Sequence, residues 1–167
     1  MKRIVLLTVS LCLLSCLLCG CFSGVMVIPN NDSIGEPQNF EKDGLTITLT
    51  DRFKEEQSKR GFDAYFVADF CGVVGLKEEF TLEEELSERP LEEYITNVIA
   101  NNGYTDITPQ TKDGLWFYET SSNGRYKVSY CYKGSDAFWI VQFICNQSDA
   151  PMLKNMFYLW ALSVEVK

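Results

Sequence analysis

Apolar and polar residues alternate through three consecutive segments of the chain, which is the pattern of a half-buried antiparallel sheet. The segments cover residues 115–120, 125–133 and 137–145. Asn123 and Gly124 lie between the first two and favour a two-residue type I′ turn, because both turn positions need a positive φ. We expect this turn to place Phe117 opposite Tyr130.

The last two segments are joined by Gly134-Ser135-Asp136. A two-residue turn at Gly134-Ser135 would place Tyr130 opposite Trp139. Both turns then put apolar residues on one shared face, as a half-buried sheet requires. The opposite face also carries large apolar residues, so we expect a helix to cover part of it. These residues are Trp116, Tyr118, Phe138, Ile140 and Ile144.

Two other segments follow the helical period. The first begins at Pro90, which suits the start of a helix, and stops at Gly103. Its apolar positions are Leu91, Tyr94, Ile95, Val98 and Ile99. The second begins near Asp149 and Pro151. Its apolar stripe consists of Leu153, Met156, Phe157 and Trp160.

Further strands are predicted at residues 45–50, 64–70, 73–77 and 163–166. The element order is therefore β-β-β-α-β-β-β-α-β. This order predicts an α+β fold in which a largely antiparallel sheet is flanked by helices. We assign it to one domain, residues 40–167, because about 130 residues suffice for a single core.

The N-terminus has the layout of an export signal. Lys2 and Arg3 precede residues 4–27, which carry no charge. The apolar core, residues 4–18, is about 15 residues long, whereas a membrane-spanning helix needs about 20. We therefore predict a signal peptide over residues 1–20.

The end of this signal, Leu18-Cys19-Gly20-Cys21, resembles the bacterial lipobox. The resemblance implies that Cys21 receives a diacylglyceryl group, although Cys19 departs from the usual Ala or Ser. Cys16 is a rival acceptor that would leave a short apolar core. An ordinary cleaved signal and an uncleaved membrane helix are the alternative interpretations. Residues 21–39 are rich in turn-forming residues and are predicted to be a lipidated tether.

Charge excludes one class of partner. Without Lys2 and Arg3 the chain has 13 basic and 23 acidic residues, a net charge of −10. Such a surface repels nucleic-acid phosphates and anionic lipid headgroups. We therefore expect no nucleic-acid role and a basic protein as the partner.

The residues needed for common catalytic and metal sites are missing from the sequence. The chain has no His and no Cys-x-x-Cys pair in the predicted domain, so we predict no metal site, no cofactor and no catalytic residue. A hydrolase that uses a pair of carboxylates remains an alternative, because spatial pairing is invisible in a sequence.

Three cysteines belong to the predicted domain: Cys71, Cys131 and Cys145. An odd number argues against a disulfide scaffold. In the register above, Cys131 lies across from Phe138 and roughly 20 Å from Cys145, beyond the reach of a disulfide. Cys71 could still meet either one.

Eight glutamates crowd residues 76–94. Their spacing lacks the pattern of a calcium-binding loop. We interpret them as a solvated loop and a helix N-terminus, where Glu favours the helix dipole. Calcium or a basic partner is the functional alternative.

Four stretches resemble the PsbP-like superfamily, which includes the extrinsic P subunit of photosystem II and a Ran-binding nuclear transport factor. They are GLTITLTDRF at 44–53, LEEY at 91–94, AFWIVQF at 137–143 and ALSV at 161–164. The resemblance covers about residues 40–167 and is greatest to small lipoproteins of Gram-positive bacteria. It implies an α/β/α sandwich that binds or assembles with partners. It carries over no functional residue, because a fold does not determine a function.

Together these observations predict a non-enzymatic interaction or assembly module, anchored through Cys21 to the extracytoplasmic face of the cell membrane. An immunity-type lipoprotein is a further alternative and would show an exposed apolar patch.

Lipidation gives the first testable prediction. We expect Cys21→Ala to release the protein into the medium or to block signal processing, because the thiol that carries the lipid is gone. The intact mass of the mature N-terminus measures cleavage and lipid together. Unchanged processing and membrane retention of the variant would contradict the prediction.

Overall fold

The computed structural model describes residues 34–57, 61–82 and 85–167. The predicted signal peptide, Cys21 and most of the predicted tether lie outside the described residues. The first strand begins at Pro37, three residues before the predicted start of the domain.

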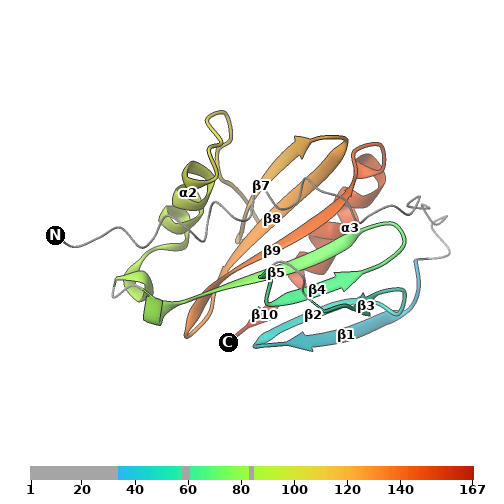
Figure 1. Ribbon diagram of the computed structural model, residues 1–167, viewed down its shortest axis with the longest axis horizontal. Helices are drawn as coiled ribbons and strands as arrows, with labels where there is room; N and C mark the ends of the chain where they lie inside the picture. Colours follow the sequence, from blue (N-terminus) through green and yellow to red (C-terminus); the bar gives the residue numbers. More distant parts are fainter. Residues whose placement is uncertain (1–33, 58–60, 83–84) are drawn as a thin grey trace.

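In the described residues, two antiparallel sheets and two α-helices, α2 and α3, build the fold (Figure 1). The large sheet has the strand order β3-β4-β5-β9-β8-β7-β6. Its strands are β3 (Lys54–Glu55), β4 (Ala64–Val67), β5 (Gly72–Glu79), β6 (Gln110–Lys112), β7 (Leu115–Ser122), β8 (Arg125–Lys133) and β9 (Ala137–Asn146). The small sheet consists of β1 (Pro37–Lys42), β2 (Leu45–Thr50) and β10 (Glu165–Val166) in the order β1-β2-β10. The helices are α2 (Leu91–Asn101) and α3 (Ala150–Leu162), with 3-10 turns at Phe80–Leu82 and Leu86–Glu88.

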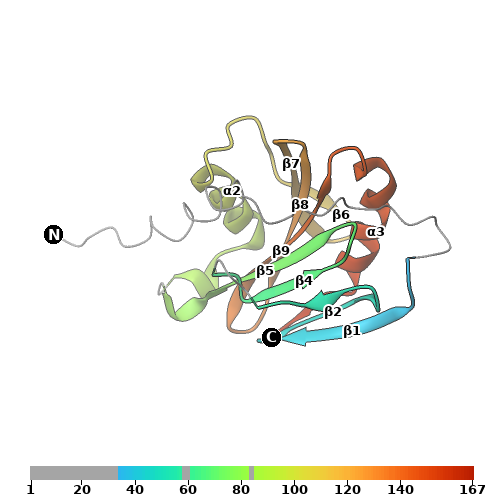
Figure 2. The same cartoon turned by 45° about the vertical axis from the view of Figure 1, so that its right-hand side comes forward.

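The helices lie on opposite faces of the large sheet (Figure 2). On one face, α2 packs its apolar stripe on the sheet, and the Tyr94 ring stacks on Phe138 with centroids 4.0 Å apart. On the other face, α3 and the small sheet share a larger core, in which Phe157 stacks on Phe143 at 5.2 Å. The predicted α+β fold with flanking helices is confirmed.

One predicted turn is confirmed and the other is wrong by one position. Asn123 and Gly124 both have positive φ, and Phe117 lies opposite Tyr130. The next turn is at Ser135-Asp136 rather than Gly134-Ser135, so Tyr130 lies opposite Val141 instead of Trp139. The resulting shift is two residues. Because side chains alternate with a period of two, the predicted core face is unchanged.

The element order contains three strands that the sequence pattern did not predict. They are β1, β3 and β6, which are short or largely exposed edge strands. An exposed edge strand has no buried side to impose alternation, so its sequence carries little signal. Both predicted helices and the predicted helical cover of the second face are confirmed.

Neither α2 nor α3, the two α-helices of the described residues, is long and apolar enough to cross a bilayer.

Gly75 sets how closely the two sheets approach. A Cβ atom at this position would lie 3.1 Å from Leu45 Cδ2 in the small sheet and 3.2 Å from Ala64 Cβ on the neighbouring strand. Both distances are tighter than ordinary van der Waals contact. The absent side chain therefore lets β2 pack directly against β5.

We expect Gly75→Ala to lower the free energy of unfolding by about 1–3 kcal/mol, because the added methyl overpacks this contact. Chemical denaturation of the variant and of the original chain measures the difference. The double variant Gly75→Ala/Ala64→Gly removes one of the clashing groups and should recover part of the loss. Equal stability of all three chains would contradict the packing argument.

All three cysteines are free and buried. Cys131 belongs to the core under α2, whereas Cys71 and Cys145 belong to the core on the other face of the sheet. The expected absence of a Cys131–Cys145 bridge is confirmed. Burial raises the pKa of all three thiols above its usual range.

Because the reactive species is the thiolate, these thiols should resist modification. We expect no reaction of Cys71, Cys131 or Cys145 with a water-soluble aromatic disulfide at mildly alkaline pH in the native state. All three should react once guanidinium unfolds the chain. Absorbance of the released thiolate counts the reacted groups, and fast labelling of the native protein would refute this packing.

Candidate functional site

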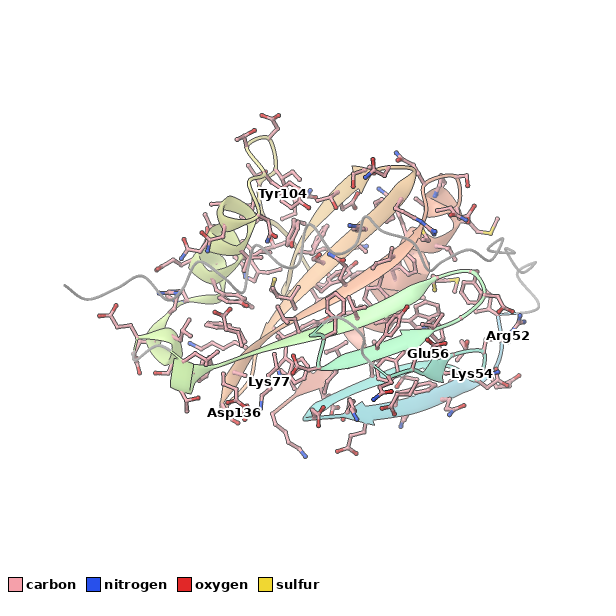
Figure 3. All side chains as sticks on the ribbon, viewed as in Figure 1. Arg52, Lys54, Glu56, Lys77, Tyr104 and Asp136 are labelled. Atoms are coloured by element: carbon pink, nitrogen blue, oxygen red, sulfur yellow. The ribbon has the colours of Figure 1, made fainter. Side chains whose placement is uncertain are left out.

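A cleft of about 570 Å³ opens between the β1–β2 turn and the hairpin formed by β3 and β4. Its walls come from both sheets. The lining residues are Lys42, Asp43, Glu55, Glu56, Gln57, Phe62, Asp63 and Tyr65. Figure 3 shows Glu56 following Lys54 along the edge that β3 forms.

Local backbone structure holds the two walls in place. Asp43 and Gly44 both have positive φ, which matches a tight two-residue hairpin turn and places Asp43 at the rim. On the other wall, the Glu56 N–H donates to the Tyr65 carbonyl at 2.9 Å. The Asp63 N–H donates to the Gly75 carbonyl, also at 2.9 Å. The cleft is therefore built on hydrogen-bonded backbone at both sides.

The cleft is acidic. Asp43, Glu55, Glu56 and Asp63 contribute four carboxylates, whereas Lys42 contributes the one cationic group among the lining residues. Lys42 Nζ lies 3.2 Å from Glu55 Oε1, and this hydrogen bond is the main reason that the pKa of Lys42 is raised. Asp63 Oδ2 accepts the Lys77 N–H at 2.7 Å. These contacts occupy two of the four carboxylates.

The other two carboxylates belong to Asp43 and Glu56. Within the described part of the chain, no cationic side chain forms an ion pair with either. Phe62 and Tyr65 add partly buried aromatic surface beside them. Carboxylates next to aromatic rings can bind the side chain of Arg or Lys. The carboxylates pair with its charge, and the rings contact its apolar stem.

No motif in the sequence marks these cleft residues. Their carboxylates come from segments 43 and 55–63, which are brought together by the packing of two sheets rather than by a spacing in the sequence. Asp43-Gly44, a dipeptide typical of tight turns, is the local signal that could have indicated the rim.

The glutamate-rich segment has a structural role where it is described. Glu78 accepts a hydrogen bond from the Tyr94 hydroxyl at 2.9 Å, and Glu93 pairs with Arg89 at 3.4 Å. Both contacts fix the start of α2. Glu83 and Glu84 lie outside the described residues. Nowhere in residues 34–57, 61–82 or 85–167 do three or more His, Cys, Asp or Glu side chains gather as a metal site would require.

The only residue predicted as a functional site, Cys21, also lies outside the described residues, so lipidation stays a prediction.

No protein-family model matches the chain, and no curated protein matches it. Among solved structures, the chain is similar to the solution structure of cyanobacterial PsbP (CyanoP) from Synechocystis sp. PCC 6803. The TM-score is 0.51 and the identity 12%, over 85% of this chain and 99% of the other. This likeness confirms the PsbP-like fold. The greater similarity to Gram-positive lipoproteins stays a prediction.

Proposed function

We propose that the protein is a lipid-anchored, extracytoplasmic binding module whose acidic cleft takes a basic segment of a partner protein. The observation that carries the proposal is the cluster of carboxylates in the cleft, with Asp43 and Glu56 forming no ion pair within residues 34–57, 61–82 and 85–167, beside the rings of Phe62 and Tyr65. The lipid anchor rests on the lipobox resemblance at Cys21 and on the export signal before it.

Charge acts at two ranges in this proposal. The net charge of −10 that remains after the predicted signal is removed attracts a basic partner from a distance and speeds its association. Inside the cleft, each exposed ion pair contributes only about 0.2–1 kcal/mol. Binding therefore depends on several weak pairs together with aromatic contact, and it should weaken as salt screens the charges.

A binding role also agrees with the chemistry present in the chain. Nucleophilic catalysis usually needs a base that titrates near neutral pH, and the chain has no His. The fold is one for which the family resemblance implies binding and assembly factors. A carboxylate-dependent hydrolase that uses the same cleft is the alternative function.

The test uses the mature chain and a peptide of alternating Arg and Gly, acetylated and amidated at its ends. We expect binding at low ionic strength that is lost at high ionic strength. Asp43→Asn/Glu56→Gln should weaken the affinity about fivefold, because it removes two carboxylates from the cleft lining. Isothermal titration calorimetry or fluorescence polarisation gives the dissociation constants.

The matched control is Glu88→Gln/Glu92→Gln, which removes the same charge from exposed positions away from the cleft lining. It should change the affinity less than twofold. Equal weakening by both double variants would show that general charge, and not the cleft, binds the peptide. If the original chain hydrolyses any of a panel of glycans or peptides and Asp43→Asn/Glu56→Gln does not, the protein is a hydrolase and the binding proposal is wrong.

A further inference from the structure

Helix α3 carries apolar side chains on its outer face as well as its inner one. Leu153, Phe157 and Trp160 are buried in the core. On the outside, Met152, Leu159 and Leu162 are 51%, 54% and 47% exposed. Their spacing of seven and three residues places them along one side of the helix. Within the described part of the chain, Leu82 is the only other large apolar side chain exposed to this degree.

The same helix is unusually poor in negative charge. Residues 150–162 contain no Asp or Glu and one cation, Lys154, in a chain of net charge −8. Lys154 Nζ pairs with Glu119 at 2.6 Å. Beside the helix, Lys112 lies over the Tyr158 ring, whose hydroxyl donates to Asp113. The nearby charges therefore largely cancel, and the repulsion of anionic headgroups expected of the whole chain is weak here.

The chain enters the domain next to this helix. The Glu36 carbonyl accepts the Asp51 N–H at 2.9 Å. Two residues further on, the Phe53 ring meets the Trp160 ring of α3 edge-on at 5.3 Å. Figures 1 and 2 both show the start of β1 and α3 at one end of the molecule and α2 at the other. Arg52 and Lys54, labelled in Figure 3, lie at the same end as the start of β1.

The tether is short enough to keep α3 near the membrane. Fourteen residues lie between Cys21 and Glu36. As a flexible coil, a segment of this length spans about 20 Å. At that distance, the face beside the start of β1 meets the bilayer often, because the anchor gives it a high effective concentration at the lipid surface.

We propose that the outer face of α3 docks on the lipid bilayer that holds the Cys21 anchor. Met152, Leu159 and Leu162 insert at the boundary between headgroups and acyl chains, as the apolar face of an interfacial helix does. The inference rests on the proposed lipid anchor. Three half-exposed side chains make only a weak, reversible contact with lipid. Stable membrane attachment therefore also needs the lipid anchor.

Docking in this way leaves the rim of the acidic cleft at Asp43 away from the lipid. The chain enters β1 at Pro37, whereas the cleft rim follows the last residue of that strand, Lys42. Six strand residues span about 20 Å. In the proposed orientation the α3 end faces the lipid, and the cleft rim at Lys42 and Asp43 lies at the other end of β1.

The experiment measures lipid contact at single sites of the mature chain. Leu159→Cys carries an environment-sensitive fluorophore, and Leu82→Cys, on the Phe80–Leu82 turn before α2, is the matched control. The native thiols are buried, so the introduced thiol is labelled selectively. Vesicles contain phosphatidylcholine and phosphatidylglycerol, with or without a nitroxide-bearing lipid as the quencher.

Two attachments separate this inference from the proposed function. In one arm the protein carries its natural lipid on Cys21. In the other arm Cys21→Ser carries an N-terminal polyhistidine tag bound to nickel-chelating lipids. We expect quenching of the label at position 159 to exceed that at position 82 at least twofold in both arms. Met152→Ser/Leu162→Ser should abolish the excess, whereas Asn155→Ser should leave it unchanged.

Each other outcome is informative. Docking with the chelating lipid but no attachment through Cys21 would overturn the lipid anchor and uphold the docking face. Equal quenching at both positions, or none at position 159 in either arm, would overturn the docking. A change at position 159 that needs no vesicles and grows with protein concentration would assign the face to a second copy or another protein instead.

Discussion

The whole architecture depends on the burial of both faces of β9. Trp139, Val141 and Phe143 point into the core shared with α3, while Phe138 and Ile140 point into the core under α2. A strand with apolar side chains on both faces needs a cover on each side. The β8–β9–β5 pairing supplies the neighbours within the sheet, and the two helices with the small sheet supply the covers.

Because both faces of the sheet are buried in the core, the candidate binding surfaces lie at its margins. The cleft forms where the small sheet meets the β3–β4 edge, and the exposed apolar stripe forms on the outside of a helix whose inside is already used. Both features consist of side chains that are not fully buried in the core. The carboxylates of the cleft and the apolar side chains of the helix suit the recognition proposed above.

Weak contacts suit a protein that is held in place by other means. Exposed ion pairs and three partly exposed apolar side chains each contribute little on their own. A lipid anchor raises the effective concentration of every such contact, both to the membrane and to partners confined near it. The acidic surface and the charge-poor helix α3 would then divide the molecule into an end for partners and an end for lipid.

The local pattern of the sequence determined the helices, the β7–β8–β9 meander and the identity of the core faces. Strong periodicity marks these elements because each has one side that must be buried. The register between β8 and β9 was decided by tertiary structure, since a turn at 134–135 or at 135–136 buries the same residues. The exposed edge strands were also invisible, because nothing forces their side chains to alternate.

The candidate site divides in the same way. The predicted export signal, the predicted lipidation at Cys21 and the acidic balance come from contiguous sequence or composition, so they need no fold to be proposed. The cleft exists because the packing of the two sheets brings Asp43 near Glu56 and Asp63. The apolar stripe of α3 was equally hidden, because a helix that is apolar on both sides does not reveal which side the core leaves exposed.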